Sequence, residues 1–161
     1  MSKISQRQVV AKVTALDKTG AALSADQQFY TDSRQYFAQV SGGEIQASVE
    51  KVYDGGATFP DVLPAPIEVG DVTVTRHYDP DDDAPKISEF RQLVGKARFR
   101  VEVFTLDADG ALVGKVRKYE KCLLVNITEP EGDSSSGGAA TFSLTFAVGT
   151  TTDASAAGTT A

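Results

Sequence analysis

The chain of 161 residues contains no tryptophan, one cysteine and one histidine, and these absences narrow its chemistry. A single cysteine allows no intrachain disulfide, and a single histidine has no second imidazole with which to share a metal ion. Cys122 begins an apolar stretch, and His77 lies in a strand-like segment. We therefore expect structural roles for both side chains, and no metal or cofactor.

The sequence also lacks membrane and secretion signals. No apolar run approaches the roughly 20 residues of a membrane-spanning helix, and the first residues lack the apolar core of a signal peptide. We expect a protein kept in a reducing compartment, with no membrane partner. The formal net charge is -6. An acidic protein is a poor candidate for gripping nucleic acid, because that affinity comes from lysine and arginine side chains that displace counterions.

Two acidic clusters have the hard oxygen ligands of a calcium site, but their surroundings favour simpler roles. Residues 79–83 read Asp-Pro-Asp-Asp-Asp without the closing glutamate of a calcium loop, and they suit the N-terminus of a helix. Asp107, Asp109 and Gly110 lie between strand-like segments and predict a hairpin turn. The glycine pairs at 42–43 and 55–56 open no phosphate-binding helix. No catalytic set remains, and we expect no enzyme activity.

Alternation of apolar and polar residues predicts a mainly β protein. The segment 45–53 places Ile45, Ala47 and Val49 on one side, which we expect to be buried. The next elements are a turn at Gly55-Gly56, an extended crossing with Pro60, Pro64 and Pro66, and a second alternating strand over residues 72–78. Because proline lacks a backbone donor, the crossing is not expected to be a central strand.

The second half contains one helix and further hairpins. Asp83 as N-cap, Pro85 in the first turn and Gly95 as the stop predict a helix over about residues 84–94. Alternating segments after it predict more strands. Six or seven strands with this helix describe a two-sheet β-sandwich or partly open barrel with one flanking helix.

Composition divides the chain into three parts. We expect an N-terminal arm or first strand in residues 1–31, a β domain in residues 32–149, and a flexible tail in residues 150–161, which has no apolar period. The Ser/Gly-rich loop 128–139 is expected to be mobile. One question of charge stays open: Arg98 and Arg100 form a positive stripe with Lys115 and Arg117, or pair across strands with Glu102 and Glu120.

The ordered motifs of the chain resemble those of bacteriophage tail tube proteins. Residues 37–43, Phe-Ala-Gln-Val-Ser-Gly-Gly, are similar to the strand and VSGL element of that family. Tyr53-Asp54-Gly55-Gly56 matches its Y-x-G-G turn, and residues 70–76 fit its G-x-(I/V)-T-(L/V)-x-R strand. With the proline crossing, the helix and the closing hairpins, the resemblance covers about residues 33–148.

This resemblance implies a structural virion protein that forms homohexameric rings stacked around a channel for DNA ejection. The implied partners are further copies of the chain, a tape-measure protein, terminator or baseplate proteins and DNA in transit. The implied location is the virion tail, after synthesis in the host cytoplasm. The candidate subunit-interface residues are Gly42, Gly43, Tyr53, Asp54, Gly55, Gly56, Pro60, Pro64 and Arg76. Glu44, Glu50 and Glu102 are candidates for the channel lining.

Two alternative functions stay open. The inner tube of a contractile injection or secretion system shares the architecture and passes proteins instead of DNA. A monomeric β-sandwich that binds a ligand such as carbohydrate belongs to another class. That module would need clustered exposed aromatic rings, whereas this chain has an aromatic fraction of 8% and no tryptophan.

Overall fold

Seven strands form the main sheet, in the order β1-β8-β9-β10-β7-β2, with β11 pairing to β9. The computed structural model describes residues 3, 8–30, 35–132, 134–135 and 137–155. All strand pairs of this sheet are antiparallel. The strands are β1 (Val9–Leu16), β2 (Gln39–Gly42), β7 (Val72–His77), β8 (Arg98–Leu106), β9 (Leu112–Thr128), β10 (Thr141–Ala147) and β11 (Thr150–Ser155).

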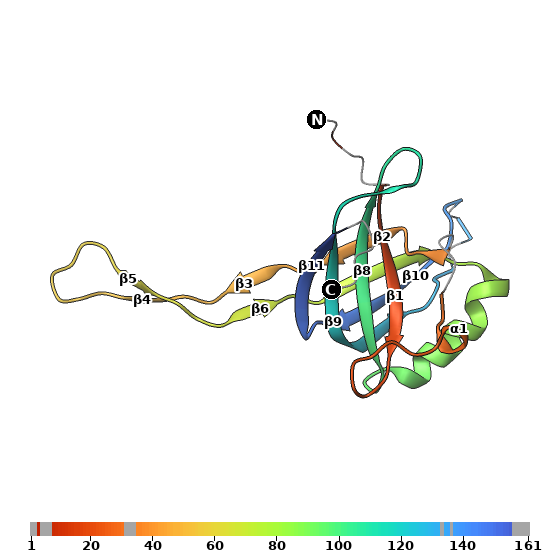
Figure 1. Cartoon of the computed structure of the whole chain (residues 1–161), viewed down its shortest axis with the longest axis horizontal. Helices are drawn as coiled ribbons and strands as arrows, with labels where there is room; N and C mark the ends of the chain where they lie inside the picture. The colour runs from red at the N-terminus through yellow and green to blue at the C-terminus, as the bar shows by residue number, and fades with distance from the viewer. Residues whose placement is uncertain (1–2, 4–7, 31–34, 133, 136, 156–161) are drawn as a thin grey trace.

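The main sheet curls until its two ends meet (Figure 1). Ala11 in β1 and Phe37 just before β2 exchange two backbone hydrogen bonds of 3.0 and 2.8 Å, as an isolated bridge and not a continuous ladder. The long strand β9 pairs with β11 along its first half and with β10 along its second half. Between the two halves, the register of β9 with β8 shifts, and Lys121 has a φ of 53°. This β-bulge bends the strand. The predicted sandwich or partly open barrel is confirmed.

The inward faces of the strands form one core in which aromatic rings predominate. Apolar residues that alternate along β1, β8 and β10 point into it, as the period of two predicts. Helix α1 (Pro80–Leu93) contributes Phe90, whose ring stacks on Phe29 with 4.3 Å between centroids. A short 3-10 helix, η2 (Ala25–Gln27), precedes Phe29. The largest buried rings are Tyr30, Phe37, Phe90, Phe99, Phe142 and Phe146.

Helix α1 begins at Pro80, earlier than the predicted start near residue 84. Asp79 is the N-cap, and its side chain accepts a hydrogen bond of 3.1 Å from the backbone N–H of Asp81. Pro80 fits the first helical position, where no backbone donor is needed. Asp83 is not the predicted N-cap, because its side chain is fully buried and pairs with Arg76. Gly95 follows the helix with a φ of 79°, in agreement with the predicted stop.

Both ends of the described chain pair with the main sheet. Residues 9–16 belong to this sheet and its core as β1, which is the first-strand alternative given for residues 1–31. Residues 150–155 of the expected flexible tail pair with β9 as β11. Backbone hydrogen bonds hold an edge strand without an apolar period, and threonine favours strands. Residues 156–161 of the tail, and residues 133 and 136 of the Ser/Gly loop, lie outside the described residues.

A long β-hairpin over residues 44–70, here called the arm, projects from the body on the side away from α1 (Figure 1). It contains two small antiparallel sheets. These pair β3 (Ile45–Ala47) with β6 (Ile67–Val69), and β4 (Glu50–Val52) with β5 (Asp61–Leu63). The predicted proline crossing is therefore the returning half of the arm, with its prolines outside the short strands.

Candidate assembly surface

The part of the arm nearest the body is apolar on one face. Cross-strand partners share a face, so β3 and β6 place Ile45, Ala47, Ile67 and Val69 on one side and Gln46 and Glu68 on the other. Ile45 is 62% exposed and Ile67 is 69% exposed. The expectation that Ile45, Ala47 and Val49 are buried is wrong for this chain by itself. The reason is that the arm leaves the body, so on this face only Val69, at the base, packs against the core.

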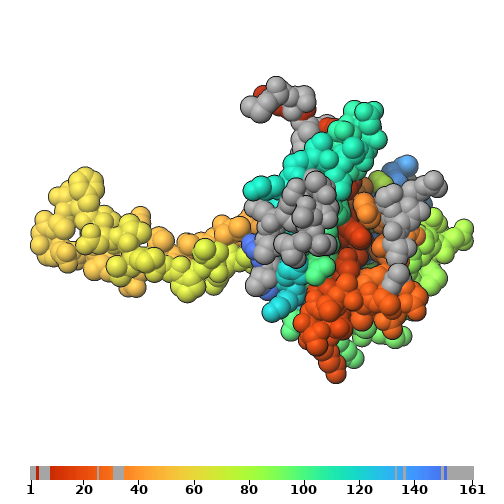
Figure 2. Space-filling model, viewed as in Figure 1, coloured from red at the N-terminus to blue at the C-terminus, as the bar shows by residue number. Residues whose placement is uncertain are grey.

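The outer half of the arm adds more exposed apolar side chains. Phe59, near the tip, is 84% exposed. The others are Val49, Val52, Tyr53, Val62 and Leu63. Figure 2 shows the arm as a thin projection surrounded by solvent along most of its length. An isolated two-stranded hairpin is marginally stable in water, and contiguous exposed apolar surface marks an interaction site. The arm therefore has the properties of a surface made to be covered.

Two consecutive glycines turn the chain from β2 into the arm. Gly42 and Gly43 have φ values of 82° and 75°, in the left-handed region that residues with a Cβ rarely adopt. A Cβ at Gly42 would overlap the carbonyl oxygen of Asp71, and one at Gly43 would lie 2.5 Å from the hydroxyl oxygen of Tyr119. The backbone N–H of Gly43 donates to Asp71 at 3.1 Å. These glycines are thus needed within the chain to set the direction of the arm.

The structure brings most of the predicted interface residues to the arm. Tyr53, Asp54, Gly55 and Gly56 lie at or near its exposed tip. Pro60 and Pro64 lie on its returning side, while Gly42 and Gly43 lie at its base. Arg76 is the exception, because it lies in β7 with its side chain 12% exposed. The part that these residues play in assembly stays a prediction.

The three predicted channel-lining residues do not lie together. Glu44 and Glu50 are on the arm, at its base and in its outer half. Glu102 lies on β8, opposite Lys12 of β1 and Lys118 of β9 in the sheet register. Which of them faces a channel stays a prediction.

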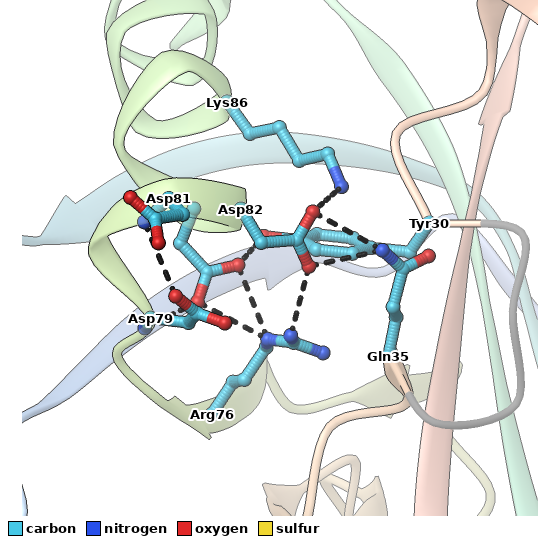
Figure 3. Close-up of polar contacts among 8 residues, drawn as sticks. Tyr30, Gln35, Arg76, Asp79, Asp81, Asp82 and Lys86 are labelled. Carbon is cyan, nitrogen blue, oxygen red and sulfur yellow. Dashed lines mark hydrogen bonds and ion pairs between the residues drawn. The ribbon is translucent and has the colours of Figure 1, made fainter.

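Arg76 belongs to a network of polar side chains at the start of α1 (Figure 3). Its Nε lies 3.2 Å from a carboxylate oxygen of Asp83, and its Nη2 donates to Asp82 at 3.1 Å. Asp83 also accepts hydrogen bonds from the Tyr30 hydroxyl at 3.0 Å and from the backbone N–H of Asp79 at 2.8 Å. These bonds tie the segment before β2 to β7 and α1.

The network also shifts two pKa values. A hydrogen bond from Lys86 at 2.9 Å, with help from Gln35 and Arg76, lowers the pKa of Asp82. Burial, followed by the nearby charge of Asp83, raises the pKa of Tyr30. The Tyr30 ring lies between two cations, 4.2 Å from Lys86 Nζ and 5.0 Å from the Arg76 guanidinium carbon. Within the network, the two cations Arg76 and Lys86 pair with the two carboxylates Asp82 and Asp83.

The other chemical candidates have structural environments. Burial raises the pKa of the Cys122 thiol to about 12, so it is protonated and inert at neutral pH. Among the described residues, no group of three His, Cys, Asp or Glu side chains could hold a metal ion. No helix in the described part of the chain is long and apolar enough to cross a membrane. Of the two alternatives for the basic residues of this hairpin, cross-strand pairing holds for Arg100 and Glu120, at 2.8 Å, while Arg98 and Glu102 have no ion pair within the described residues.

Comparisons with known proteins give the fold a context. No protein-family model and no curated protein sequence matches this chain. Among solved structures, it is similar to a chain of the 6-fold symmetrised anti-feeding prophage baseplate, with 12% identity and a TM-score of 0.72 over 98% of this chain and 99% of that one.

Two further solved structures resemble the chain along nearly its whole length. One is a chain of the anti-feeding prophage tube-terminating cap, with 15% identity and a TM-score of 0.69 over 96% of this chain and 93% of that one. The other comes from the sheath–tube complex of an extracellular contractile injection system, with 13% identity and a TM-score of 0.69 over 95% and 92% of the two chains. The chain has the fold found in these assemblies.

Proposed function

We propose that this chain is a non-enzymatic tube subunit that assembles with copies of itself into stacked homohexameric rings around a channel. One observation carries the proposal: from Ile45 and Ile67 to Phe59, the arm presents exposed apolar side chains that no described part of the same chain covers. Burial of apolar surface is the main driving force of association. A second copy supplies that cover without any other protein, and repeated contacts of this kind build rings.

The fold supports a tube in preference to a ligand-binding module. The matched structures are a baseplate, a tube-terminating cap and a sheath–tube complex, and the baseplate is 6-fold symmetrised. Terminator and baseplate proteins are accordingly the partners proposed at the two ends of the tube. The location proposed is a phage-tail-like particle, assembled after synthesis in the bacterial cytoplasm.

Two cargoes fit such a channel. One of the matched structures is the sheath–tube complex of an extracellular contractile injection system, which favours an injection tube that passes proteins. The sequence motifs resemble phage tail tubes, which favours passage of DNA and a tape-measure protein inside the tube. For the DNA cargo, the acidic chain, with a net charge of -6, suits a channel that must not hold nucleic acid.

Electron microscopy of the purified full chain tests the tube proposal. We expect rings or tubes of 6-fold symmetry from the unaltered chain, and their loss in the double variant Ile45→Thr/Ile67→Thr. The Val125→Thr variant is the control, since Val125 is an exposed valine of β9 outside the arm. A chain that stays a monodisperse monomer at high concentration, even with terminator or baseplate proteins present, would contradict the proposal.

A further inference from the structure

A hollow of about 380 Å³ lies where the turn after β1 meets the start of β8 and the bulge of β9. Each of these three segments contributes a basic side chain to its lining, namely Lys18, Arg98 and Lys121. Asp17 is the acidic residue of the lining. Three positive charges against one negative charge leave the hollow with a net charge of +2. This local excess is unusual in a chain whose overall charge is -6.

The described part of the chain gives these three cations no carboxylate partner. Its ion pairs involve other basic residues, namely Arg76, Lys86, Arg91 and Arg100. The Asp17 carboxylate accepts hydrogen bonds from its own turn, from the backbone N–H groups of Thr19 at 2.8 Å and Ala21 at 3.1 Å. An anion from outside the chain is therefore the missing charge.

One contact joins two of the three lining segments. Arg98 Nη1 donates to the backbone carbonyl oxygen of Lys121 at 3.5 Å. Lys121 itself has a φ of 53°, a conformation that residues with a Cβ rarely adopt. Three cations that line one hollow repel one another, and a bound carboxylate relieves that repulsion. The hollow is thus arranged for a negatively charged group.

The arm carries the opposite charge. Residues 44–70 contain five acidic residues and one basic residue, a net charge of -4. The register of β4 and β5 places Glu50 and Asp61 on the same face, together with Val52 and Leu63, and Lys51 on the other face. Glu50 and Asp61 are exposed, and neither has an ion pair within the described residues. This acidic face matches the hollow in charge.

The length of the arm fits contact with a second copy. Twelve residues from the base to the tip span about 40 Å at roughly 3.3 Å per residue. A body of about 130 residues has a radius of gyration of about 14 Å. The arm is therefore about as long as the body is wide, and it points away from its own body (Figure 1). Its tip can reach across a neighbour.

We infer that the hollow of Lys18, Arg98 and Lys121 receives the acidic face of the arm, Glu50 and Asp61, of a second copy. This inference rests on the proposed self-assembly and adds which two surfaces meet. The contact is heterologous, since each copy offers one arm and one hollow, so identical contacts run from copy to copy and close into a ring. Complementary charge fixes the register and the partner of such a contact.

Charge reversal on each side separately, and then on both sides, tests the pairing. We expect Lys18→Glu/Arg98→Glu and Glu50→Lys/Asp61→Lys each to raise at least tenfold the protein concentration at which rings form, measured by sedimentation velocity and negative-stain microscopy. Mixing the two variants should restore rings, because arms and hollows of opposite charge then alternate, and a six-membered ring accommodates that alternation. A chain that carries all four substitutions should assemble alone.

Matched controls separate this pairing from a general effect of charge. Lys115→Glu and Lys51→Glu reverse exposed charges outside the hollow and on the other face of the arm, and both should assemble like the unaltered chain. Circular dichroism of every variant verifies that it is folded. If the hollow variant assembles normally, or the reversed arm fails to rescue it, the inference is overturned while the tube proposal stands. If the unaltered chain forms no assembly, the tube proposal itself fails.

A polyanion is the competing occupant of the hollow. Binding of a fluorescent single-stranded oligonucleotide, followed by anisotropy, measures it directly. If Arg98→Glu loses oligonucleotide binding and still assembles normally, the occupant of the hollow is nucleic-acid phosphate and not the arm. We expect instead weak binding that does not depend on Arg98, and assembly that weakens as salt is raised.

Discussion

Asp83 is the residue at which burial and charge oppose each other most strongly. Its side chain has no exposure and is satisfied by Arg76, Tyr30 and the backbone of Asp79. A buried ion pair is weak support for stability by itself, and without Asp83 the Arg76 guanidinium still pairs with Asp82 at 3.1 Å. The backbone N–H of Asp79 would lose the carboxylate that accepts its hydrogen bond. The Tyr30 hydroxyl would lose its acceptor at the same time.

We therefore predict that Asp83→Ala lowers the free energy of unfolding by at least about 1–3 kcal/mol, the cost of a buried hydrogen-bonding group left without a partner. Urea denaturation followed by circular dichroism measures it. Asp81→Ala is the matched control, because Asp81 is an exposed carboxylate on the same helical turn and should change stability by no more than about 0.5 kcal/mol. Equal effects of the two substitutions would show that the buried contacts of Asp83 add nothing to the free energy of unfolding.

Asp82 in the same network gives a prediction about pH. Its pKa is lowered in the folded protein, chiefly by the hydrogen bond from Lys86. A group whose pKa falls on folding stabilises the protein above its unfolded pKa, near 3.9 for aspartate, and loses that contribution as pH falls through the folded pKa. We expect the unaltered chain to lose more stability than Asp82→Asn between pH 6 and pH 2.5.

Denaturation midpoints at several pH values check this expectation, with Glu89→Gln on the exposed side of α1 as the control. The control should follow the unaltered chain throughout. Parallel curves for Asp82→Asn and the unaltered chain would exclude a contribution from this carboxylate.

At the scale of elements, the junction between β2 and the arm depends on glycine in a way that the tip does not. Gly42 combines a positive φ with backbone atoms of Asp71 in the space that a Cβ would occupy. Gly55 at the tip has no atom within 4 Å of that space. Substitutions at Gly42 and Gly55 can therefore distinguish an effect on folding from an effect on assembly.

We predict that Gly42→Ala lowers the free energy of unfolding by at least about 1–2 kcal/mol, the cost of the left-handed conformation alone. Gly55→Val should change it by no more than about 0.5 kcal/mol and should impair ring formation more than folding. Urea denaturation and negative-stain microscopy of both variants give the two readouts. Gly56→Val is a poorer probe, because Gly56 has a φ of 82°.

Some elements could be predicted from the sequence more completely than others. Period-two alternation identified the strands of the body, because their inward residues meet a core, as Phe99 and Val101 do. The same rule failed for Ile45, whose alternation was interpreted as burial within the chain. The rule indicates that a face needs to be covered, and it cannot say whether the covering surface belongs to the same molecule.

The predicted start of α1 is too late because Asp79 and Asp83 are equally good caps by sequence, and only the buried position of Asp83 beside Arg76 decides between them.

The sequence predicts where along the chain the candidate surface lies, but not that it forms a single β-hairpin arm. Glycines and prolines between residues 42 and 66 indicated turns and an extended crossing, which correctly marked an unusual segment. That these turns make one arm depends on pairing Ile45 with Val69, a contact between residues far apart in the sequence. The hollow of Lys18, Arg98 and Lys121 was missed for the same reason, since β1, β8 and β9 come together only in the folded sheet.

For the whole molecule, the chain divides into a body with a complete core and an arm without one. The body buries large aromatic rings from both halves of the sequence in one core. The arm has only its cross-strand pairs, and segments with few buried contacts open with low free energy. Its order should therefore depend on assembly, in contrast to that of the body.

Hydrogen exchange read by mass spectrometry tests this difference. In the monomer, we predict that amides of β3 to β6 exchange within seconds while those of β8 and β9 stay protected for hours. In assembled rings, peptides from residues 44–70 should gain protection of about 100-fold or more, since an opening cost of 2.7 kcal/mol from partner binding corresponds to about that factor. The dissociated Glu50→Lys/Asp61→Lys variant is the control and should keep the monomer pattern in the arm at the same protein concentration. An arm already protected in the monomer, with no change on assembly, would mean that its apolar face has no need of a second copy.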